Sequence, residues 1–255
     1  MHKMTTKRLV VLQCYATERE GLKVVIPLAP YKWDELKDTL TVEWMAYSQY
    51  LHEHIRELSN SINEFRQYIL SLTAWSFVLD KLKEEEKYHA IIEYITPLAT
   101  LALNIPYVIR SRFIYSVAHL SHQANQSKVE NWKDDLPIDD EIYFDQADVQ
   151  GKYWKKYNKL KTVLESVSNS KYKKATHDFR NTYNHRYSPR IEIGLSGFVK
   201  RIVKSGRVTY GYGETEPLLL RDIVPLLTEQ HELLLKAYTR YQALVNEQVT
   251  VINNA

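Results

Sequence analysis

After Pro30, apolar residues recur at spacings of three and four, and this period limits the chain's fold more than any other feature. It continues through residues 33–82 and is the spacing by which an amphipathic helix buries one face. The run Ser59-Asn60-Ser61 interrupts it and predicts a break between two helices. The same period predicts helices over 84–96, 98–125, 146–167 and 171–187, and from Pro217 to about residue 250.

Two segments have the two-residue period of strands instead. Residues 190–213 alternate, are rich in Ile, Val and Tyr, and contain a Ser205-Gly206 turn, which predicts a β-hairpin inserted between helices. Residues 1–30 contain the β-prone runs RLVVLQC and LKVVIPL, which predict an N-terminal extended arm or small hairpin. We therefore expect a mainly α protein: an arm over 1–30 and a single helical domain over 31–255, with five helices in one bundle and the hairpin as an appendage.

Composition narrows the class of protein. A chain of 255 residues with 44% hydrophobic content can bury a substantial core. The 34 basic and 31 acidic residues give a net charge of +3, which permits a nucleic-acid partner without requiring one. Cys14 is the single cysteine, so an internal disulfide is excluded, and the N-terminal apolar run is too short for a signal peptide. These features predict a cytoplasmic protein.

The most membrane-like window covers residues 91–109. It contains Glu93, Asn104, Pro97 and Pro106 within a length barely sufficient to cross a bilayer. We interpret it as a buried, kinked helix and expect no membrane partner.

The histidines do not form a convincing metal site. His52 and His54 lie about 200° apart on a helix, and His119 and His122 share a face that has only Asn and Gln nearby. The E-x-x-H sequence at 86–89 lacks the second copy that a di-iron bundle needs. The fragment GYGETE lacks the third glycine of a dinucleotide-binding motif. We expect neither a metal nor a cofactor.

One predicted helix has an unusual polar face. At about 100° per residue, a stripe at i, i+3, i+4, i+7 and i+8 is formed by His177, Arg180, Asn181, Asn184 and His185. The opposite, packing face would consist of Tyr172, Ala175, Phe179 and Tyr183. Solvated helix faces are usually rich in Glu and Lys, whereas Asn and His are poorer helix formers. The composition favours a functional stripe over a plain amphipathic surface helix, which is the alternative.

The stripe combines groups suited to phosphodiester chemistry. Imidazole acts as a base or an acid near neutral pH, and a guanidinium binds phosphate in bidentate fashion. In RNA, a base can deprotonate the 2′-hydroxyl for attack on phosphorus while an acid protonates the leaving 5′-oxygen. The stripe therefore predicts RNA cleavage that needs no metal.

The segment Arg180-Asn181-Thr182-Tyr183-Asn184-His185 resembles the R-x(4 to 6)-H motif of the HEPN family, including the polar residue directly after the arginine. The resemblance covers the helices around 146–187 and 216–250, whereas the N-terminal arm and the hairpin depart from the minimal fold. It implies a bundle of four or five helices that forms a homodimer with two motifs facing one cleft. Many members are metal-independent endoribonucleases of toxin–antitoxin, abortive-infection or CRISPR systems; others are inactive RNA-binding or scaffolding modules.

By this resemblance, Arg180 and His185 form the catalytic pair and Asn181 supports them. Substrate-binding roles are predicted for His177, Asn184, Lys174 and Arg186. The sequence also fits the longer R-x4-H-x-Y form, found in toxins that a small nucleotidyltransferase silences by adenylating the tyrosine. Tyr187 is thus a candidate modification site, although it also suits the start of the connection to the hairpin.

Basic residues cluster in sequence around the motif and along the hairpin, and Tyr210 and Tyr212 are available to stack on bases. The cluster consists of Lys171, Lys173, Lys174, Arg186, Arg190, Lys200, Arg201, Lys204 and Arg207. The alternative is that these charges only solubilise exposed strand edges.

Two hypotheses follow. The first is a ribonuclease acting as a toxin or defence effector, with RNA, a second copy of the chain and an antitoxin or nucleotidyltransferase as partners. The second is a non-catalytic HEPN-like module that binds RNA, a nucleotide or a protein.

Overall fold

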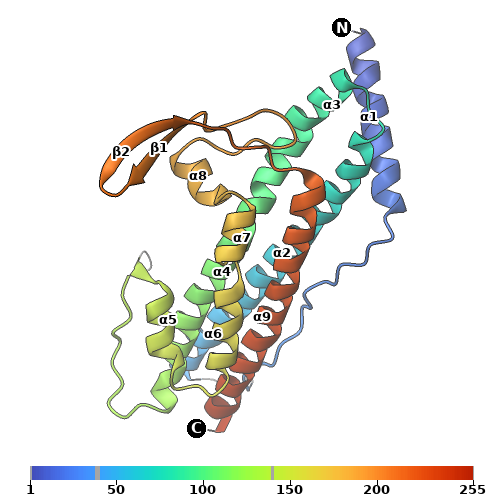
Figure 1. The fold of residues 1–255 in the computed structure, drawn as a ribbon. Coiled ribbons are helices and arrows are strands. Elements are labelled where there is room, and N and C mark those ends of the chain that lie inside the picture. The colour runs from blue at the N-terminus through green and yellow to red at the C-terminus, as the bar shows by residue number, and fades with distance from the viewer. Residues whose placement is uncertain (1, 38–40, 139–140, 255) are drawn as a thin grey trace. The chain divides into compact units, whose positions relative to one another are not determined.

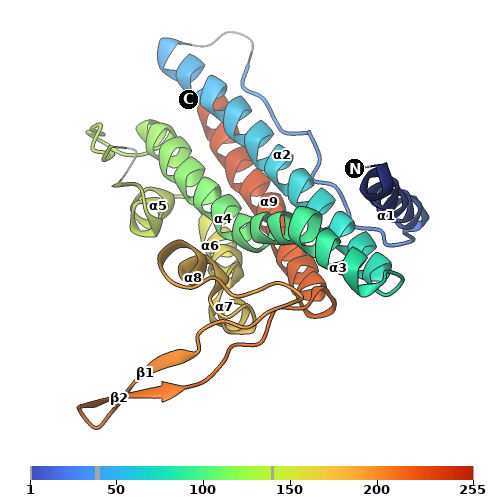
Figure 2. The same cartoon turned by 90° about the horizontal axis from the view of Figure 1, so that it is seen from above.

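The computed structural model describes residues 2–37, 41–138 and 141–254. It is mainly helical and contains one two-stranded antiparallel sheet, as Figures 1 and 2 show. The prediction of a mainly α protein with an inserted hairpin is therefore confirmed. The chain forms two compact units: Met1–Ile26, Arg66–Ile105 and Asn169–Glu229 make up the first, and Pro27–Phe65, Pro106–Ser168 and Gln230–Ala255 the second. The division into an arm and a single domain at residue 30 stays a prediction.

The first unit contains the motif and the hairpin. Its elements are α1 (His2–Gly21), the later part of α2 (Val42–Leu79), α3 (Glu84–Ala90), the π-helix η1 (Ile91–Ile95), the start of α4 (Thr96–Ala124), α7 (Ser170–Ala175), α8 (Phe179–His185), β1 (Val199–Lys204), β2 (Arg207–Tyr212) and the start of α9 (Leu220–Asn254).

The prediction of an extended arm or hairpin over residues 1–30 is wrong for most of that segment, because residues 2–21 form α1. Ring stacking shows why. Tyr15 stacks on Trp75 at a centroid distance of 4.6 Å, and Trp75 stacks on Tyr94 at 5.4 Å. Glu18 pairs with Lys81 at 2.5 Å. Such tertiary contacts override a weak β-propensity, and residues 22–30, which follow α1, have no regular secondary structure.

The hairpin has the turn that its sequence indicates. β1 and β2 pair antiparallel from Val199↔Tyr212 to Lys204↔Arg207. Ser205 and Gly206 have φ angles of 49° and 77°, and a type I′ turn requires positive values at both positions. The strands are shorter than the predicted range of 190–213. At the base, the bridges Ser196↔Thr215 and Ile191↔Leu218 join the two sides of the hairpin, and the N–H of Gly213 donates to the Phe198 carbonyl at 3.0 Å.

The second unit contains the beginning of α2, the later part of α4, η2 (Asn125–Ser127), α5 (Phe144–Gly151), α6 (Tyr157–Ser166) and most of α9. Buried tyrosines contribute to its core, and their hydroxyls have polar partners. Tyr47 donates to Gln248 at 2.9 Å, and the hydroxyls of Tyr241 and Ser116 lie 2.5 Å apart. Satisfied hydroxyls allow these large rings to be buried without leaving a polar group unpaired.

The predicted break at residues 59–61 is wrong, because α2 is continuous through them. Ser61 Oγ donates to the Glu57 carbonyl at 2.7 Å, and the Ser59 hydroxyl lies 2.6 Å from that of Tyr238. Both serines find partners without ending the helix, which removes the reason for a break.

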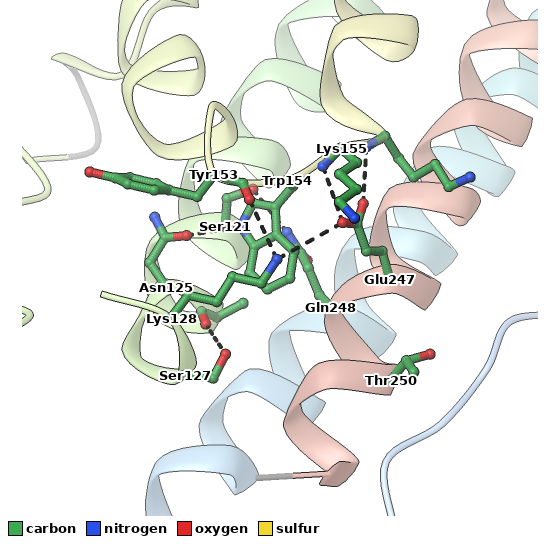
Figure 3. Close-up of polar contacts among 12 residues, drawn as sticks. Ser121, Asn125, Ser127, Lys128, Tyr153, Trp154, Lys155, Glu247, Gln248 and Thr250 are labelled. Carbon is green, nitrogen blue, oxygen red and sulfur yellow. Dashed lines mark hydrogen bonds and ion pairs between the residues drawn. The ribbon is translucent and has the colours of Figure 1, made fainter. Parts of the chain in front are cut away.

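The helix predicted over 146–167 is divided into α5 and α6, and a polar cluster stabilises the turn between them (Figure 3). The Trp154 indole donates to Asn125 Oδ1 at 2.9 Å. The Glu247 carboxylate accepts the backbone N–H groups of Lys155 and Lys156 at 3.1 and 2.9 Å. These amides precede α6, so Glu247 satisfies donors that the start of a helix leaves unpaired.

The helices predicted over 84–96 and 98–125 form one continuous segment, since η1 joins α3 to α4. Among the described residues, Glu84–Ser127 is one helical segment long and apolar enough to cross a membrane by length and composition, and 33% of its most apolar window is buried. A core helix of a soluble protein passes the same test.

Candidate functional site

The motif does not lie on the single helix predicted over 171–187. The chain forms α7, turns at residues 176–178 and begins again as α8. The N–H of Asp178 donates to the Lys173 carbonyl at 2.6 Å, and the N–H of His177 donates to the Lys174 carbonyl at 3.3 Å. This is the hydrogen-bond pattern of a Schellman motif that ends α7. His177 and Asp178 take φ angles of 53° and 50°, so the usual glycine signal is missing from the sequence.

The turn changes the predicted stripe. His177 lies outside α8, whereas Arg180, Asn181, Asn184 and His185 all lie on it. Arg180, Asn184 and His185 are exposed, as is His177. Four of the five stripe residues therefore share a helix, and His177 lies in the turn that precedes it.

The predicted packing face is half correct. Phe179 is 2% exposed, and Tyr172 is buried with its hydroxyl donating to the Leu103 carbonyl at 3.0 Å. Burial raises the pKa of Tyr172 well above its usual range. Ala175 and Tyr183 are exposed, although the Tyr183 ring stacks on Phe179 at 5.7 Å. Phe179 is thus the apolar anchor that positions α8.

The amide of Asn181 has a partner within the turn. Its Nδ2 donates to Asp178 Oδ2 at 3.0 Å, and Thr182 Oγ1 donates to the Asp178 carbonyl at 3.0 Å. Asp178, the residue that precedes α8, therefore fixes the orientation of the Asn181 side chain. The predicted supporting role of Asn181 stays a prediction.

The remaining predicted residues flank α8. Lys174 lies in the last turn of α7 and is exposed. Arg186 follows α8 with extended backbone angles, and its N–H donates to the Thr182 carbonyl at 2.9 Å. Tyr187 is 83% exposed, so its hydroxyl is accessible to a modifying enzyme. The roles of these three residues stay predictions.

Two pockets are lined in part by residues 183–199, which include the end of α8 and the chain that follows it. The first, here called the hairpin pocket, has a volume of about 350 Å³ and is lined by Tyr187, Ser188, Arg190, Leu195, Ser196, Gly197, Phe198 and Val199. The second, the helix pocket, has a volume of about 490 Å³ and is lined by Tyr88, Ile91, Ile92, Thr96, Thr100, Tyr183, Ser188, Pro189, Arg190, Ile191, Ile193 and Gly194. Ser188 and Arg190 line both pockets.

Sequence reasoning missed the helix pocket. Tyr88, Ile91 and Ile92 come from α3 and η1, far from the motif along the chain. A π-helical turn has no composition signature, although such turns are frequent at functional sites. The hairpin pocket was closer to prediction, because Tyr187 and Arg190 already belonged to the candidate residues.

The segment that carries the site is strongly cationic. Residues 179–213 contain Glu192 as their one acidic residue, against the basic residues Arg180, Arg186, Arg190, Lys200, Arg201, Lys204 and Arg207. The Glu192 carboxylate accepts the backbone N–H of Leu220 at 2.5 Å, and burial raises its pKa. The segment therefore suits an anionic ligand. Among the described residues, no group of three or more His, Cys, Asp or Glu residues is placed to hold a metal ion.

Comparison with protein-family models, with curated proteins and with solved structures finds no match to this chain. The resemblance to HEPN proteins thus depends on the motif alone.

Proposed function

We propose that this protein is a metal-independent endoribonuclease of HEPN type, with Arg180 and His185 as its catalytic pair. The observation that carries the proposal is the exposure of both side chains on α8, at the start of a segment, residues 179–213, whose one acidic residue is Glu192. Asp178 directly precedes this segment and accepts a hydrogen bond from Asn181. Phe179 is buried and anchors α8, so the helix that carries Arg180 and His185 is held in a fixed position. A phosphodiester approaching α8 meets a guanidinium, an imidazole and further cations.

In the proposed reaction, His185 takes the proton of the RNA 2′-hydroxyl, and the 2′-oxygen attacks the adjacent phosphorus. The bond between phosphorus and the 5′-oxygen breaks, and an acid returns a proton to that oxygen. Arg180 stabilises the negative charge on the phosphoryl oxygens. The products are a 2′,3′-cyclic phosphate and a 5′-hydroxyl, so atoms and charges balance without a metal.

A second proton-transfer group is needed for this scheme. Arg180 and His185 are five residues apart and lie about 140° apart around α8. In a two-fold homodimer, the α8 helices of the two copies would line one shared groove, and the second copy would supply another His185 to it. Within a single chain, His177 on the preceding turn is the candidate acid.

The neighbouring residues take binding roles in this proposal. Asn181 supports the pair, while His177, Asn184, Lys174 and Arg186 contact the RNA backbone. Adenylation of Tyr187 by a nucleotidyltransferase would place a charged group near His185 and repel an anionic substrate. The exposure of Tyr187 and its place in the lining of the hairpin pocket support this regulation.

The test is incubation of the purified protein with structured and unstructured RNA in EDTA. We expect cleavage by the wild type and its loss in Arg180→Ala and in His185→Ala, with unchanged folding by circular dichroism. Exposed Tyr143, which belongs to the other unit, provides the matched control Tyr143→Ala, which should cleave normally. Cleavage that persists in His185→Ala would assign the activity to another group.

The second candidate function is a non-catalytic HEPN-like module that binds RNA, a nucleotide or a protein partner. The bond from Asn181 to Asp178 favours it, because the amide of Asn181 is turned to a structural partner. The same assay separates the two: this candidate predicts binding without cleavage in the wild type.

A further inference from the structure

We infer that one face of the hairpin is a stacking platform for a single-stranded stretch of RNA leading into the hairpin pocket. The inference rests on the proposed function for the identity of the strand as substrate. Its evidence is separate, since it comes from the hairpin rather than from Arg180 and His185.

The strand register defines the platform. Side chains of directly paired residues lie on the same face of a sheet, and every second residue along a strand shares that face. Val199 pairs with Tyr212, Arg201 with Tyr210 and Val203 with Val208. These six residues, here called the platform, form one face, with the two tyrosines about 7 Å apart along β2 at a rise of about 3.4 Å per residue.

The platform is exposed within its unit. Tyr210 is 71% and Tyr212 is 97% exposed, and Val199, Arg201 and Val203 are exposed as well. In Figures 1 and 2 the hairpin extends away from α7 and α8. An isolated two-stranded hairpin with an uncovered apolar face has little stability in water. A bound ligand that covers the platform would therefore stabilise it.

Charge favours a nucleic acid as the occupant. Residues 193–213 contain Lys200, Arg201, Lys204 and Arg207 and no Asp or Glu. A second copy of the same face would bring like charges together without any carboxylate to pair them, which disfavours self-association. A polyanion with aromatic bases satisfies both features, because bases stack on tyrosine while phosphates pair with arginine and lysine.

The hairpin pocket continues the platform. Val199 belongs to both, and Tyr187 and Phe198 add aromatic rings to the pocket lining. Arg190 supplies a cation and Ser196 a hydroxyl to the same cavity of about 350 Å³. A nucleotide entering it from the platform would lie beside the segment that joins the pocket to α8.

This mode of binding has a defined selectivity. Every base has a face for stacking, so the platform would tolerate many sequences. A duplex keeps its bases stacked on each other and cannot present them to the tyrosines. The platform should thus prefer single-stranded RNA to the same sequence in a duplex.

The test measures the Kd of the full-length protein for a fluorescent 2′-O-methyl oligoribonucleotide, single-stranded and as a duplex. The modified strand cannot be cleaved by its own 2′-oxygen, so binding is separated from catalysis. Tyr210→Ala with Tyr212→Ala should raise the single-strand Kd by about 25-fold or more, from a factor of about five for each base lost from a stack. Tyr210→Phe with Tyr212→Phe should bind normally, and so should Tyr143→Ala.

Arg201→Gln provides a second readout that does not depend on the tyrosines. Loss of one phosphate contact should lower the slope of log Kd against log salt concentration by about 0.7 for a single strand. Circular dichroism of each variant checks that the helices are intact.

The outcomes separate this inference from the proposed function. If the tyrosine double variant weakens binding but the wild type does not cleave ordinary RNA, the platform would be retained and the nuclease overturned. If the wild type cleaves RNA but Tyr210→Ala with Tyr212→Ala changes the single-strand Kd by less than about threefold, the platform would be overturned and the nuclease retained. Unchanged RNA binding combined with loss of self-association in the variants would assign the face to a second copy and overturn the inference.

Discussion

Phe179 is the residue on which the position of α8 depends, because it is the fully buried side chain next to Arg180. Phe179→Ala should lower the free energy of unfolding by about 3 kcal/mol, through lost burial and the cavity left behind. Urea denaturation measures it. Tyr187→Ala is the matched control and should have little effect, since Tyr187 is exposed. Equal stability of the two variants would mean that α8 is not anchored by this ring.

Arg180→Ala and His185→Ala should each abolish cleavage and leave the melting temperature nearly unchanged. Both side chains are exposed, and surface substitutions usually alter stability by less than about 0.5 kcal/mol. Thermal unfolding and RNA cleavage are measured on the same preparations. A large fall in melting temperature would instead identify a structural pair.

His54 gives a prediction for pH dependence. Burial, together with nearby His119, lowers the pKa of His54 from 6.5 to about 4. Between these values the unfolded chain holds the proton and the folded chain does not, so stability is full above pH 6.5 and falls as the pH drops towards 4. The loss is about 3 kcal/mol from this residue. His54→Phe should flatten the dependence in urea titrations at pH 7 and 4.5; an unchanged slope would contradict the assignment.

At the scale of elements, the turn between α7 and α8 can be tested by whether a glycine at position 177 raises or lowers the free energy of unfolding. His177 holds a left-handed conformation that glycine adopts freely, so His177→Gly should raise the free energy of unfolding by about 1 kcal/mol. If residues 171–187 formed one helix, the same change would instead lower it by about 0.4 kcal/mol, because glycine is a poorer helix former than histidine. Ala175→Gly, within α7, is the control and should destabilise.

The elements also show how far the sequence could predict this fold. The hairpin and α9 followed from alternation, turn residues and helical period, which are local signals. The Schellman turn at His177 was missed because it lacks glycine, and α1 was missed because packing of Tyr15 on Trp75 outweighs local propensity. Of the site, the motif residues were predictable, whereas the helix pocket was not, because it needs residues of α3 and η1 brought beside the motif.

At the scale of the whole molecule, the proposed nuclease is a two-fold homodimer with a composite groove. Mixing inactive Arg180→Ala chains with inactive His185→Ala chains should restore a small part of the cleavage, because subunit exchange creates grooves with one intact arginine and one intact histidine. In such a groove His177 would have to replace the missing second His185 as the acid, so recovery should be well below the wild-type rate. Each variant mixed with itself is the control. A monomeric mass at micromolar concentration together with full activity would contradict the shared groove and favour His177 as the second proton-transfer group.

The most direct measurement of the central claim is the mass of the RNA products formed in EDTA. Attack by the 2′-hydroxyl predicts fragments ending in a 2′,3′-cyclic phosphate and beginning with a 5′-hydroxyl. These fragments should be absent with His185→Ala and absent when a 2′-deoxynucleotide replaces the one before the cleaved bond. Products with a 5′-phosphate, or cleavage that requires added Mg²⁺, would contradict the assignment of Arg180 and His185 as a metal-independent catalytic pair.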